Sequence, residues 1–352
     1  MAPASSARGW SYARAGVDVA WRSRALAGLL AEIRYRPPPT HGRLVDLPGH
    51  YAGLVRIGRE TVALTTDTVG TKVLLAERTG RWEEVGEDIV QVNVNDLAAV
   101  GARPAGLVDV ILCARPDEAV FAAIGRGLDR GLRAAGCALL GGETAIVPDI
   151  VTGIDLGGTA LGFFPRGRRP VTGARIRPGD RILGIPSSGL HANGFTLVRR
   201  LLDEAGVDVD QPRPGGKRPL SAELLAAGRI YTDPSEALAD RSETHGLAHL
   251  SGGGVRNLVR LGDRVAYVLD RWPTVPPLFE YLRSLGSLSE EEMFQTFNMG
   301  VGFVAIVGRE HLAETRRRLA RAGAPDAVEI GHVERGSGVE IPSRGLRYSG
   351  YE

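Results

Sequence analysis

Two series of alternating strand-like and helix-like segments make up most of this sequence, and a single stretch that favours neither structure separates them. The separating stretch, from Pro165 to Asp180, reads P-R-G-R-R-P-V-T-G-A-R-I-R-P-G-D, and its prolines and glycines interrupt regular structure. Alternating strands and helices are typical of mixed α/β domains. Because 352 residues exceed the usual size of one hydrophobic core, we predict two such domains.

The predicted boundaries follow from the same patterns. An N-terminal arm is expected at residues 1–52, an N-terminal α/β domain at 53–170 and a C-terminal α/β domain at 171–352. In the arm, apolar residues at helical spacing predict a helix from Val19 to Arg34. This helix is expected to end before the prolines of R-P-P-P, at Arg36 to Pro39.

Hydrophobic periodicity also places the elements of each domain. The N-terminal domain is predicted to begin with a hairpin within residues 53–66, whose second strand leads into Asp67. The further elements expected there are helices at 84–101 and 116–136 and strands at 105–113, 137–140 and 156–164. Expected in the C-terminal domain are strands at 181–186, 246–250, 264–269 and 301–307, a last strand ending near 333, and helices at 194–205 and near 220, 234, 255, 275 and 311.

Composition narrows the kind of partner. A net charge of +2 creates no general field that would attract nucleic acid or an anionic membrane, so a small molecule is the expected partner. No run approaches the roughly 18 apolar residues of a membrane span, and the start, M-A-P-A-S-S-A-R-G-W, lacks the apolar core of a signal peptide. We therefore expect a cytoplasmic protein. Cys113 and Cys137 lie in apolar, strand-like surroundings without a C-x-x-C, which predicts two buried thiols.

The stretch T-T-D-T-V-G-T-K, ending at Lys72, contains one of only two lysines in a chain with 43 basic residues. Asp67 stands at the end of an apolar strand, Gly70 permits close backbone approach, and Thr71 and Lys72 offer hydrogen-bond donors. Such a group suits phosphate and Mg²⁺, which prefers oxygen ligands. The spacing is not that of a P-loop, and a plain turn is the alternative interpretation.

Two further groups carry polar side chains in unusual places. Asn93, Asn95 and Asp96 interrupt an apolar helical run, where burial without partners would be costly, so they favour a cation or nucleotide site over a solvated helix face. Glu143, in G-G-E-T with Thr144, is predicted on a glycine-supported turn at the carboxyl end of a strand. The alternative there is an ordinary surface turn.

Glycine-rich loops in the C-terminal half contain two histidines of interest. In S-S-G-L-H-A-N-G-F, His191 and Asn193 precede a helix, where free amides and an imidazole suit an anion or an acid/base step. In A-H-L-S-G-G-G, His249 is followed by Ser251, Gly252, Gly253 and Gly254, an anion-binding pattern. The alternative for either histidine is a structural role, and His245 is expected to have one.

Taken in order, these stretches resemble the aminoimidazole ribonucleotide synthetase family, also called phosphoribosylformylglycinamidine cyclo-ligase. The resemblance rests on Y-A-R-A-G-V-D, D-T-V-G-T-K, V-N-D, G-G-E-T-A, S-S-G-L-H-A-N-G-F-T-L-V-R, R-I-Y, A-H-L-S-G-G-G and F-N-M-G-V-G, which run from Tyr12 to Gly302. Each motif is modest, but the ordered set is specific.

The resemblance implies two α/β domains with mixed sheets, flanking helices in the C-terminal domain, and a homodimer in which the N-terminal sheets build a shared barrel near bound ATP. It implies ATP- and Mg²⁺-dependent closure of formylglycinamidine ribonucleotide to aminoimidazole ribonucleotide, with release of ADP and phosphate.

The resemblance also implies roles for site residues. The catalytic group would be His191, Lys72 and Asp67, and the metal ligands Asp67, Asp96 and Glu143. The ATP contacts would be Thr71, Lys72, Asn95, Asp96, Glu143 and Thr144. The substrate contacts would be Asn193, His249, Ser251, Gly252, Gly253 and Gly254.

The sequence departs from the family pattern at three places. Thr68 stands where glycine is usual, Arg14 where an acid is usual, and the early glycine-rich loop is reduced to L-P-G-H-Y-A-G-L at Leu47 to Leu54. Alternatives with the same architecture are enzymes of the thiamine-monophosphate kinase or selenophosphate synthetase type. A nucleotide-binding paralogue without catalytic activity is a further alternative.

Overall fold

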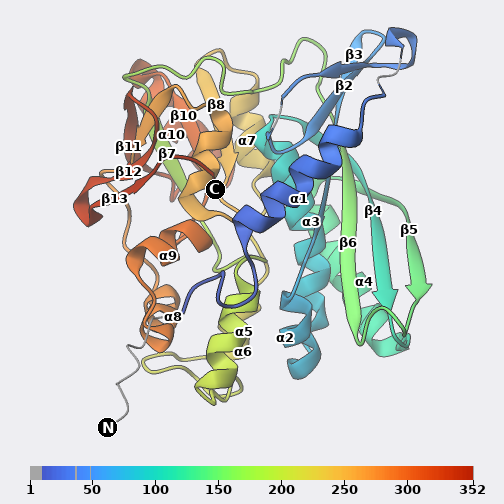
Figure 1. The fold of residues 1–352 in the computed structure, drawn as a ribbon. Coiled ribbons are helices and arrows are strands. Elements are labelled where there is room, and N and C mark those ends of the chain that lie inside the picture. Colours follow the sequence, from blue (N-terminus) through green and yellow to red (C-terminus); the bar gives the residue numbers. More distant parts are fainter. Residues whose placement is uncertain (1–9, 36–37, 48, 352) are drawn as a thin grey trace.

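The computed structural model describes residues 10–35, 38–47 and 49–351. Its two halves are α/β units, each built on its own mixed sheet (Figure 1). Residues 1–9, which include most of the start expected to lack a signal peptide, lie outside the described residues, as do Arg36 and Pro37 of the predicted helix stop. The predicted arm helix is present as α1 (Val19–Glu32), capped by the side chain of Asp18, which accepts from the Trp21 amide.

The described part of the N-terminal half contains a six-stranded sheet in the order β1-β2-β3-β6-β4-β5. All neighbours are antiparallel except β4 and β5, which are parallel. The strands are β1 (Arg43–Val45), β2 (Gly53–Ile57), β3 (Glu60–Thr68), β4 (Arg103–Cys113), β5 (Ala138–Ile146) and β6 (Ile154–Phe163). The helices are α2 (Lys72–Thr79), α3 (Trp82–Ala99) and α4 (Glu118–Ala135), and α3 packs against α4 and against β3, β4 and β6.

The C-terminal half contains a sheet whose seven described strands follow the order β13-β12-β9-β11-β7-β10-β8. These strands are β7 (Arg181–Pro186), β8 (Thr244–His249), β9 (Val265–Val268), β10 (Val301–Val307), β11 (Val328–Arg335), β12 (Gly338–Ile341) and β13 (Leu346–Tyr348). The α-helices are α5 (Phe195–Glu204), α6 (Leu220–Leu224), α7 (Thr232–Ala239), α8 (Pro277–Gly286), α9 (Glu290–Thr296) and α10 (Leu312–Arg321). Short 3₁₀ helices are η1 (Pro39–His41), η2 (Gly254–Leu261), η3 (Arg309–His311) and η4 (Pro342–Arg344).

The prediction of a mixed α/β protein with two sheets is confirmed, and the long elements lie close to their predicted positions. The elements that were not predicted are short: the helices α2 and α9 and the strands β1, β12 and β13. Segments of three to eight residues contain too little periodicity to be distinguished from loops. In the described part of the chain, no helix has the length and apolar character that crossing a membrane requires.

One face of the N-terminal sheet is covered by helices, while the other exposes apolar side chains. Along β3, Ala63 and Thr65 are buried and Leu64 between them is half exposed, which is the alternation of a strand with one covered face. Leu64 is paired with Leu161 of β6, so both side chains lie on the uncovered face. Val108, Val110 and Phe163 are also exposed.

The two cysteines are free thiols, in agreement with the prediction that they form no disulfide. Cys113 is buried, as predicted. Cys137 is only half-buried, because it directly precedes the edge strand β5, and burial raises the pKa of its thiol to about 11.

Candidate active site

Predicted site residues from both halves of the chain meet where α3 faces the end of β8. Oδ1 of Asp96 lies 2.9 Å from Nδ1 of His249, and since a carboxylate oxygen accepts, Nδ1 donates. The other ring nitrogen, Nε2, lies 3.4 Å from Nε2 of Gln91, whose amide can donate to it. His249 is therefore held from both sides by α3. Gln91 was missed by the sequence analysis as a site residue because only the fold brings it to His249.

Asp67 lies at the end of β3, beside this pair. Its side chain is exposed, and its Oδ1 accepts a hydrogen bond of 2.8 Å from the amide of Thr68. Loss of solvating water around the carboxyl group, together with the charge of Asp96, raises the pKa of Asp67 to about 6. The Thr68 amide, His249 and Arg260 act in the opposite direction. Asp67 and Asp96 thus act on each other electrostatically.

Thr68, which departs from the family pattern, causes no backbone strain. The φ angle of Thr68 is not positive, so its conformation in the strand does not need glycine. The guanidinium of Arg14 lies 4.6 Å from the centre of the Trp10 ring.

Lys72 does not lie where its predicted contact with a phosphoryl group requires. It is fully buried, and its Nζ donates to the carbonyl oxygens of His191 at 2.9 Å and Ala226 at 3.1 Å. The same Nζ forms an ion pair with Oδ2 of Asp88 at 2.5 Å. Protein oxygens therefore surround the ammonium in this structure. The hydroxyl of Thr71, the preceding residue, lies 2.9 Å from that of Thr196.

The side-chain amide of Asn95, a predicted ATP contact, likewise forms its hydrogen bonds with other groups of the protein. Its Nδ2 donates to the carbonyl of Arg229 at 2.9 Å, and its Oδ1 accepts from the amide of Tyr231 at 2.8 Å. Asn93 is also buried, and its Nδ2 donates to the carbonyl of Ile89 at 2.9 Å. Asn95 therefore ties the R-I-Y segment of the C-terminal half to α3.

Glu143 and Thr144 lie within β5 and not on a turn. The predicted strand end at residue 140 is wrong, because β5 continues to Ile146. The glycines mark an irregularity instead: the register of β4 and β5 shifts between Leu107 and Val108, and Gly141 has a φ of +152°.

The strand register separates Glu143 from Asp67. Asp67, Gly158, Asp109 and Gly142 form one row across the sheet, and paired residues share a face. Glu143 follows Gly142, so it projects from the opposite face. The three predicted metal carboxylates therefore do not form one group within the chain, and the described residues contain no cluster of three or more His, Cys, Asp or Glu arranged for a metal.

His191 lies in its predicted loop before α5 but is fully buried. Its φ is +60°, which is uncommon for a residue with a side chain, and neither ring nitrogen has a hydrogen-bond partner among the described residues. Burial, reinforced by His249, Lys72 and Arg229, holds the pKa of its imidazole well below the usual range. The ring is therefore neutral at pH 7, with its centre 6.3 Å from that of His249.

Asn193 lies against the glycine loop after β8. Oδ1 of Asn193 is 3.0 Å from the place that a Cβ would occupy on Gly252, which shows how closely the two segments approach. Gly253 and Gly254 have φ values of +109° and +53°, conformations that favour glycine. Nδ2 of Asn257 donates to the carbonyl of Gly254 at 3.0 Å and holds the loop from below.

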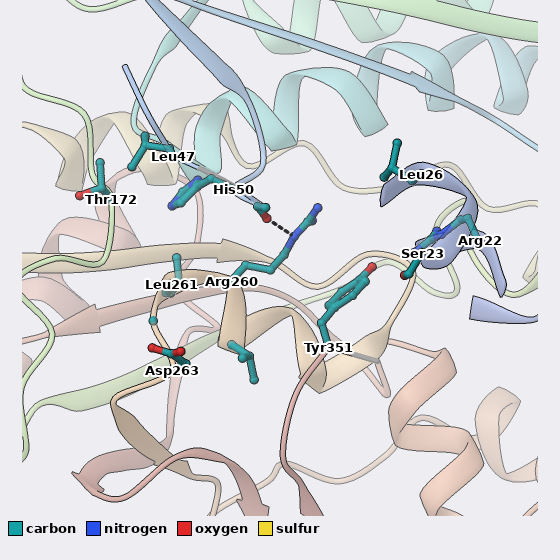
Figure 2. A pocket seen from close by; sticks show the side chains of 13 residues that line it. Arg22, Ser23, Leu26, Leu47, His50, Thr172, Arg260, Leu261, Asp263 and Tyr351 are labelled. Carbon is teal, nitrogen blue, oxygen red and sulfur yellow. Dashed lines mark hydrogen bonds between the residues drawn. The ribbon is translucent and has the colours of Figure 1, made fainter. Parts of the chain in front are cut away.

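A cavity of about 830 Å³ lies between α1, the segment at Leu47 to His50, η2 and the C-terminal segment (Figure 2). Nε of Arg260 donates to the carbonyl of Gly49 at 2.9 Å, and its guanidinium lies 5.3 Å from the ring centre of Tyr351. The hydroxyl of Tyr351 donates to the carbonyl of Gly252 at 2.8 Å, so the cavity adjoins the glycine loop. Burial and the charge of Arg260 lower the pKa of His50 to about 4.

None of these cavity residues is predicted from the sequence as a site residue. Leu47, Gly49 and His50 belong to the reduced glycine-rich stretch, and the others come from α1, Thr172, the η2 region and the end of the chain, where no motif marks them.

Comparison with known proteins connects this geometry to one family. Residues 49–164 match the family described as AIR synthase related protein, N-terminal domain, and residues 177–342 match its C-terminal domain. The phosphoribosylformylglycinamidine cyclo-ligase of Thermococcus kodakarensis is 42% identical, over 96% of this chain and 99% of its own length. That of Methanocaldococcus jannaschii is 39% identical, over 92% of each chain.

Solved structures with lower identity show the same fold. A thiamine-monophosphate kinase from Stenotrophomonas maltophilia has a TM-score of 0.62 at 21% identity and covers 94% of this chain and 98% of its own. The hydrogenase maturation protein HypE from E. coli has a TM-score of 0.57 at 19% identity, with 82% and 84% covered. These likenesses concern architecture alone, whereas the curated relatives match nearly the whole sequence, and the chain therefore belongs to the phosphoribosylformylglycinamidine cyclo-ligase family.

Proposed function

We propose that this protein closes formylglycinamidine ribonucleotide to aminoimidazole ribonucleotide with ATP, releasing ADP and phosphate. The observation that carries this proposal is the meeting of Asp67 and Asp96 with His249 of the other half, in a chain up to 42% identical to named cyclo-ligases. The kinase and maturation proteins share only the fold with this chain, so they favour no alternative activity.

The reaction needs positioning and charge neutralisation more than covalent chemistry from the protein. ATP would phosphorylate the formyl oxygen, a nitrogen of the substrate would attack that carbon, and phosphate would leave. His191 is our candidate for stabilising the phosphoryl group by a hydrogen bond, because its lowered pKa keeps the imidazole neutral and makes it a weak base. Thr71, Thr144, Asn193, His249 and the loop from Ser251 to Gly254 remain our candidates for holding the two substrates.

Mg²⁺ fits the pair of carboxylates Asp67 and Asp96. The charge of Asp96 raises the proton affinity of the Asp67 carboxyl, a repulsion that a bound cation would relieve, and carboxylate oxygens are the ligands that Mg²⁺ prefers. Bound there, the ion would supply charge for the phosphoryl oxygens of ATP.

The pKa of Asp67 predicts how metal affinity depends on pH. As pH falls through about 6, Asp67 takes up a proton and loses its charge, so the affinity for Mg²⁺ should fall there and not near pH 4. Calorimetric titration of Mg²⁺ between pH 8 and pH 5 measures this. Asp67→Asn should bind weakly at every pH, and an unchanged Mg²⁺ affinity in the native protein from pH 7 to pH 5 would remove Asp67 from the site.

The cavity beside the glycine loop is our proposed site for the ribonucleotide phosphate, because Arg22 and Arg260 both line it. Arg260→Gln should raise KM for formylglycinamidine ribonucleotide by about ten-fold or more, the scale of one hydrogen bond to a charged group. Steady-state kinetics measures this. Arg264→Gln, on an exposed residue outside the cavity lining, is the matched control and should leave KM unchanged. Equal KM in Arg260→Gln and the native protein would place the phosphate elsewhere.

The uncovered face of the N-terminal sheet supports a homodimer in which two such faces enclose a barrel. Glu143 projects from this face, so in the dimer it would approach the partner's sheet and not its own Asp67.

Leu161→Glu should convert the dimer to monomers, measured by light scattering, because it places a charge within an apolar contact. Leu29→Glu on the exposed side of α1 should leave the dimer intact. A native protein that is monomeric at micromolar concentration contradicts the proposal.

The activity itself is tested by incubation with ATP, Mg²⁺ and formylglycinamidine ribonucleotide, following ADP and the aminoimidazole product together. Equal amounts of both are expected. ADP without the imidazole would indicate a kinase-type relative, and neither product would indicate a paralogue without catalytic activity. We further propose a cytoplasmic location, which cell fractionation tests.

A further inference from the structure

Lys72 and Asp88 form an ion pair inside the protein. Both side chains have 0% exposure, and Nζ and Oδ2 are 2.5 Å apart. Lys72 opens α2 and Asp88 lies in α3, so both belong to the N-terminal half. Burial raises the pKa of Asp88, and the neighbouring ammonium opposes that rise. A buried pair of this kind seldom adds net stability compared with apolar side chains of similar size, so its presence calls for another reason.

Within the described residues, the side-chain hydrogen bonds of the pair go to backbone of the C-terminal half, and Nζ of Lys72 also lies 5.4 Å from the centre of the Phe195 ring. Nζ of Lys72 donates to the carbonyl oxygens of His191 and Ala226, and Oδ1 of Asp88 accepts from the amide of Gly228 at 2.8 Å. Two loops that are distant in sequence, one before α5 and one after α6, are thereby attached to the same two side chains.

The approach of the second loop to α3 is close. A Cβ on Gly228 would lie 2.4 Å from Oε1 of Gln91, so a side chain there would require the loop or the buried Gln91 side chain to shift. Gln91 in turn lies next to His249. Two residues of α3 thus hold the loop, Asp88 by accepting from the Gly228 amide and Gln91 by close contact.

The first loop holds His191 in a conformation that it would rarely adopt alone. Its φ of +60° lies in the left-handed region, and its ring makes no hydrogen bond with the described residues that would hold it there. The hydrogen bond that Lys72 donates to the carbonyl of His191 acts directly on this backbone.

The need for lysine follows from the arrangement of the acceptors. The compact ammonium directs hydrogen bonds to separate carbonyls and an ion pair to a carboxylate, whereas the guanidinium of arginine is a larger planar group. This explains a lysine at position 72 in a chain that uses arginine almost everywhere else.

We infer that Lys72 and Asp88 form an interdomain clamp, which positions the His191 loop and the Ala226–Gly228 loop for the reaction. Lys72 is then a positioning residue and not a ligand of ATP. This role rests on the proposed function in one respect, since the measurement of kcat requires the ring-closing reaction.

The decisive variant is Lys72→Met/Asp88→Leu, which removes both charges together and leaves no unpaired buried ion. We expect it to fold and to bind ATP within about three-fold of the native protein, while kcat falls by about ten-fold or more. The NMR resonances of the His191 ring, recorded without substrate, should shift or broaden because its carbonyl is no longer held. Lys217→Met, at the other lysine, lies in an exposed loop and should match the native protein in all three measurements.

A second variant tests the clamp without altering a charge. Gly228→Ala should force the loop or the Gln91 side chain to shift, lower kcat and leave ATP affinity unchanged. A double variant with native kcat and native His191 resonances would overturn the clamp, as would native values for both in Gly228→Ala. A loss of ATP affinity of about ten-fold or more in the double variant would overturn it in favour of a direct phosphate contact. The NMR and ATP-binding results stand even if the protein closes no imidazole ring.

Discussion

Replacing Asp88 by leucine, with Lys72 left in place, is expected to destabilise the protein by about 3–5 kcal/mol, because it leaves one buried charge without its partner. The change also removes the acceptor of the Gly228 amide, which stays buried at the same close contact. Denaturant unfolding followed by circular dichroism gives the change in free energy. Lys72→Met should have an effect of similar size, since it leaves the Asp88 carboxylate unpaired.

The double variant provides the internal test of this prediction. Lys72→Met/Asp88→Leu should be more stable than either single variant, because apolar side chains replace both ions. As an exposed control, Asp129→Ala breaks an ion pair with Arg133 on the surface of α4 and should leave the unfolding midpoint unchanged. If the two single variants unfold at the native midpoint, the ion pair contributes nothing to the packing of the two halves.

Asp67→Asn is expected to lower kcat for ring closure by about 10²-fold or more, the scale on which single electrostatic contacts act in a transition state. The amide keeps the size of the side chain and can still accept from the Thr68 amide, so the fold should be preserved. What it removes is the charge that faces Asp96 and the proposed Mg²⁺. Coupled measurement of ADP and aminoimidazole ribonucleotide at saturating ATP gives kcat.

Glu60→Gln is the matched control, because it makes the same kind of change at the opposite, exposed end of β3. It should turn over at the native rate. Native turnover in Asp67→Asn, with the oligomeric state unchanged, would mean that this carboxylate takes no part in the reaction. A raised Mg²⁺ requirement with recovery of kcat at high Mg²⁺ would confine its role to binding the metal.

The long elements of this protein were predictable because each carries its own periodicity. The hairpin before Asp67, the helix α3 and the strand β10 all follow from alternation or helical spacing within a few residues. The residue types of the site were also visible, since Asp96 and His249 are polar groups where the pattern calls for apolar ones. Their pairing was not, because it joins positions that are 153 residues apart.

Glu143 shows where local reasoning fails. Two glycines before it suggested a turn, yet β5 continues through them with a shift of register. In a strand, one residue of difference decides which face a side chain occupies. Glu143 therefore projects from the face opposite Asp67, and only the pairing of β5 with β4, and of β4 with β6, determines this.

Residue types and short spacings were enough to predict the two α/β halves, the order of the motifs and the family they resemble. The role of Lys72 depends instead on contacts that form only in the folded protein. Beside Asp67, Gly70 and Thr71 it has the pattern of a phosphate ligand, but the packing of α2 and α3 against the C-terminal loops buries it against Asp88 and two carbonyls. A charge responds to whatever lies within a few ångströms, and for Lys72 those atoms come from residues 16 to 154 positions away in the chain.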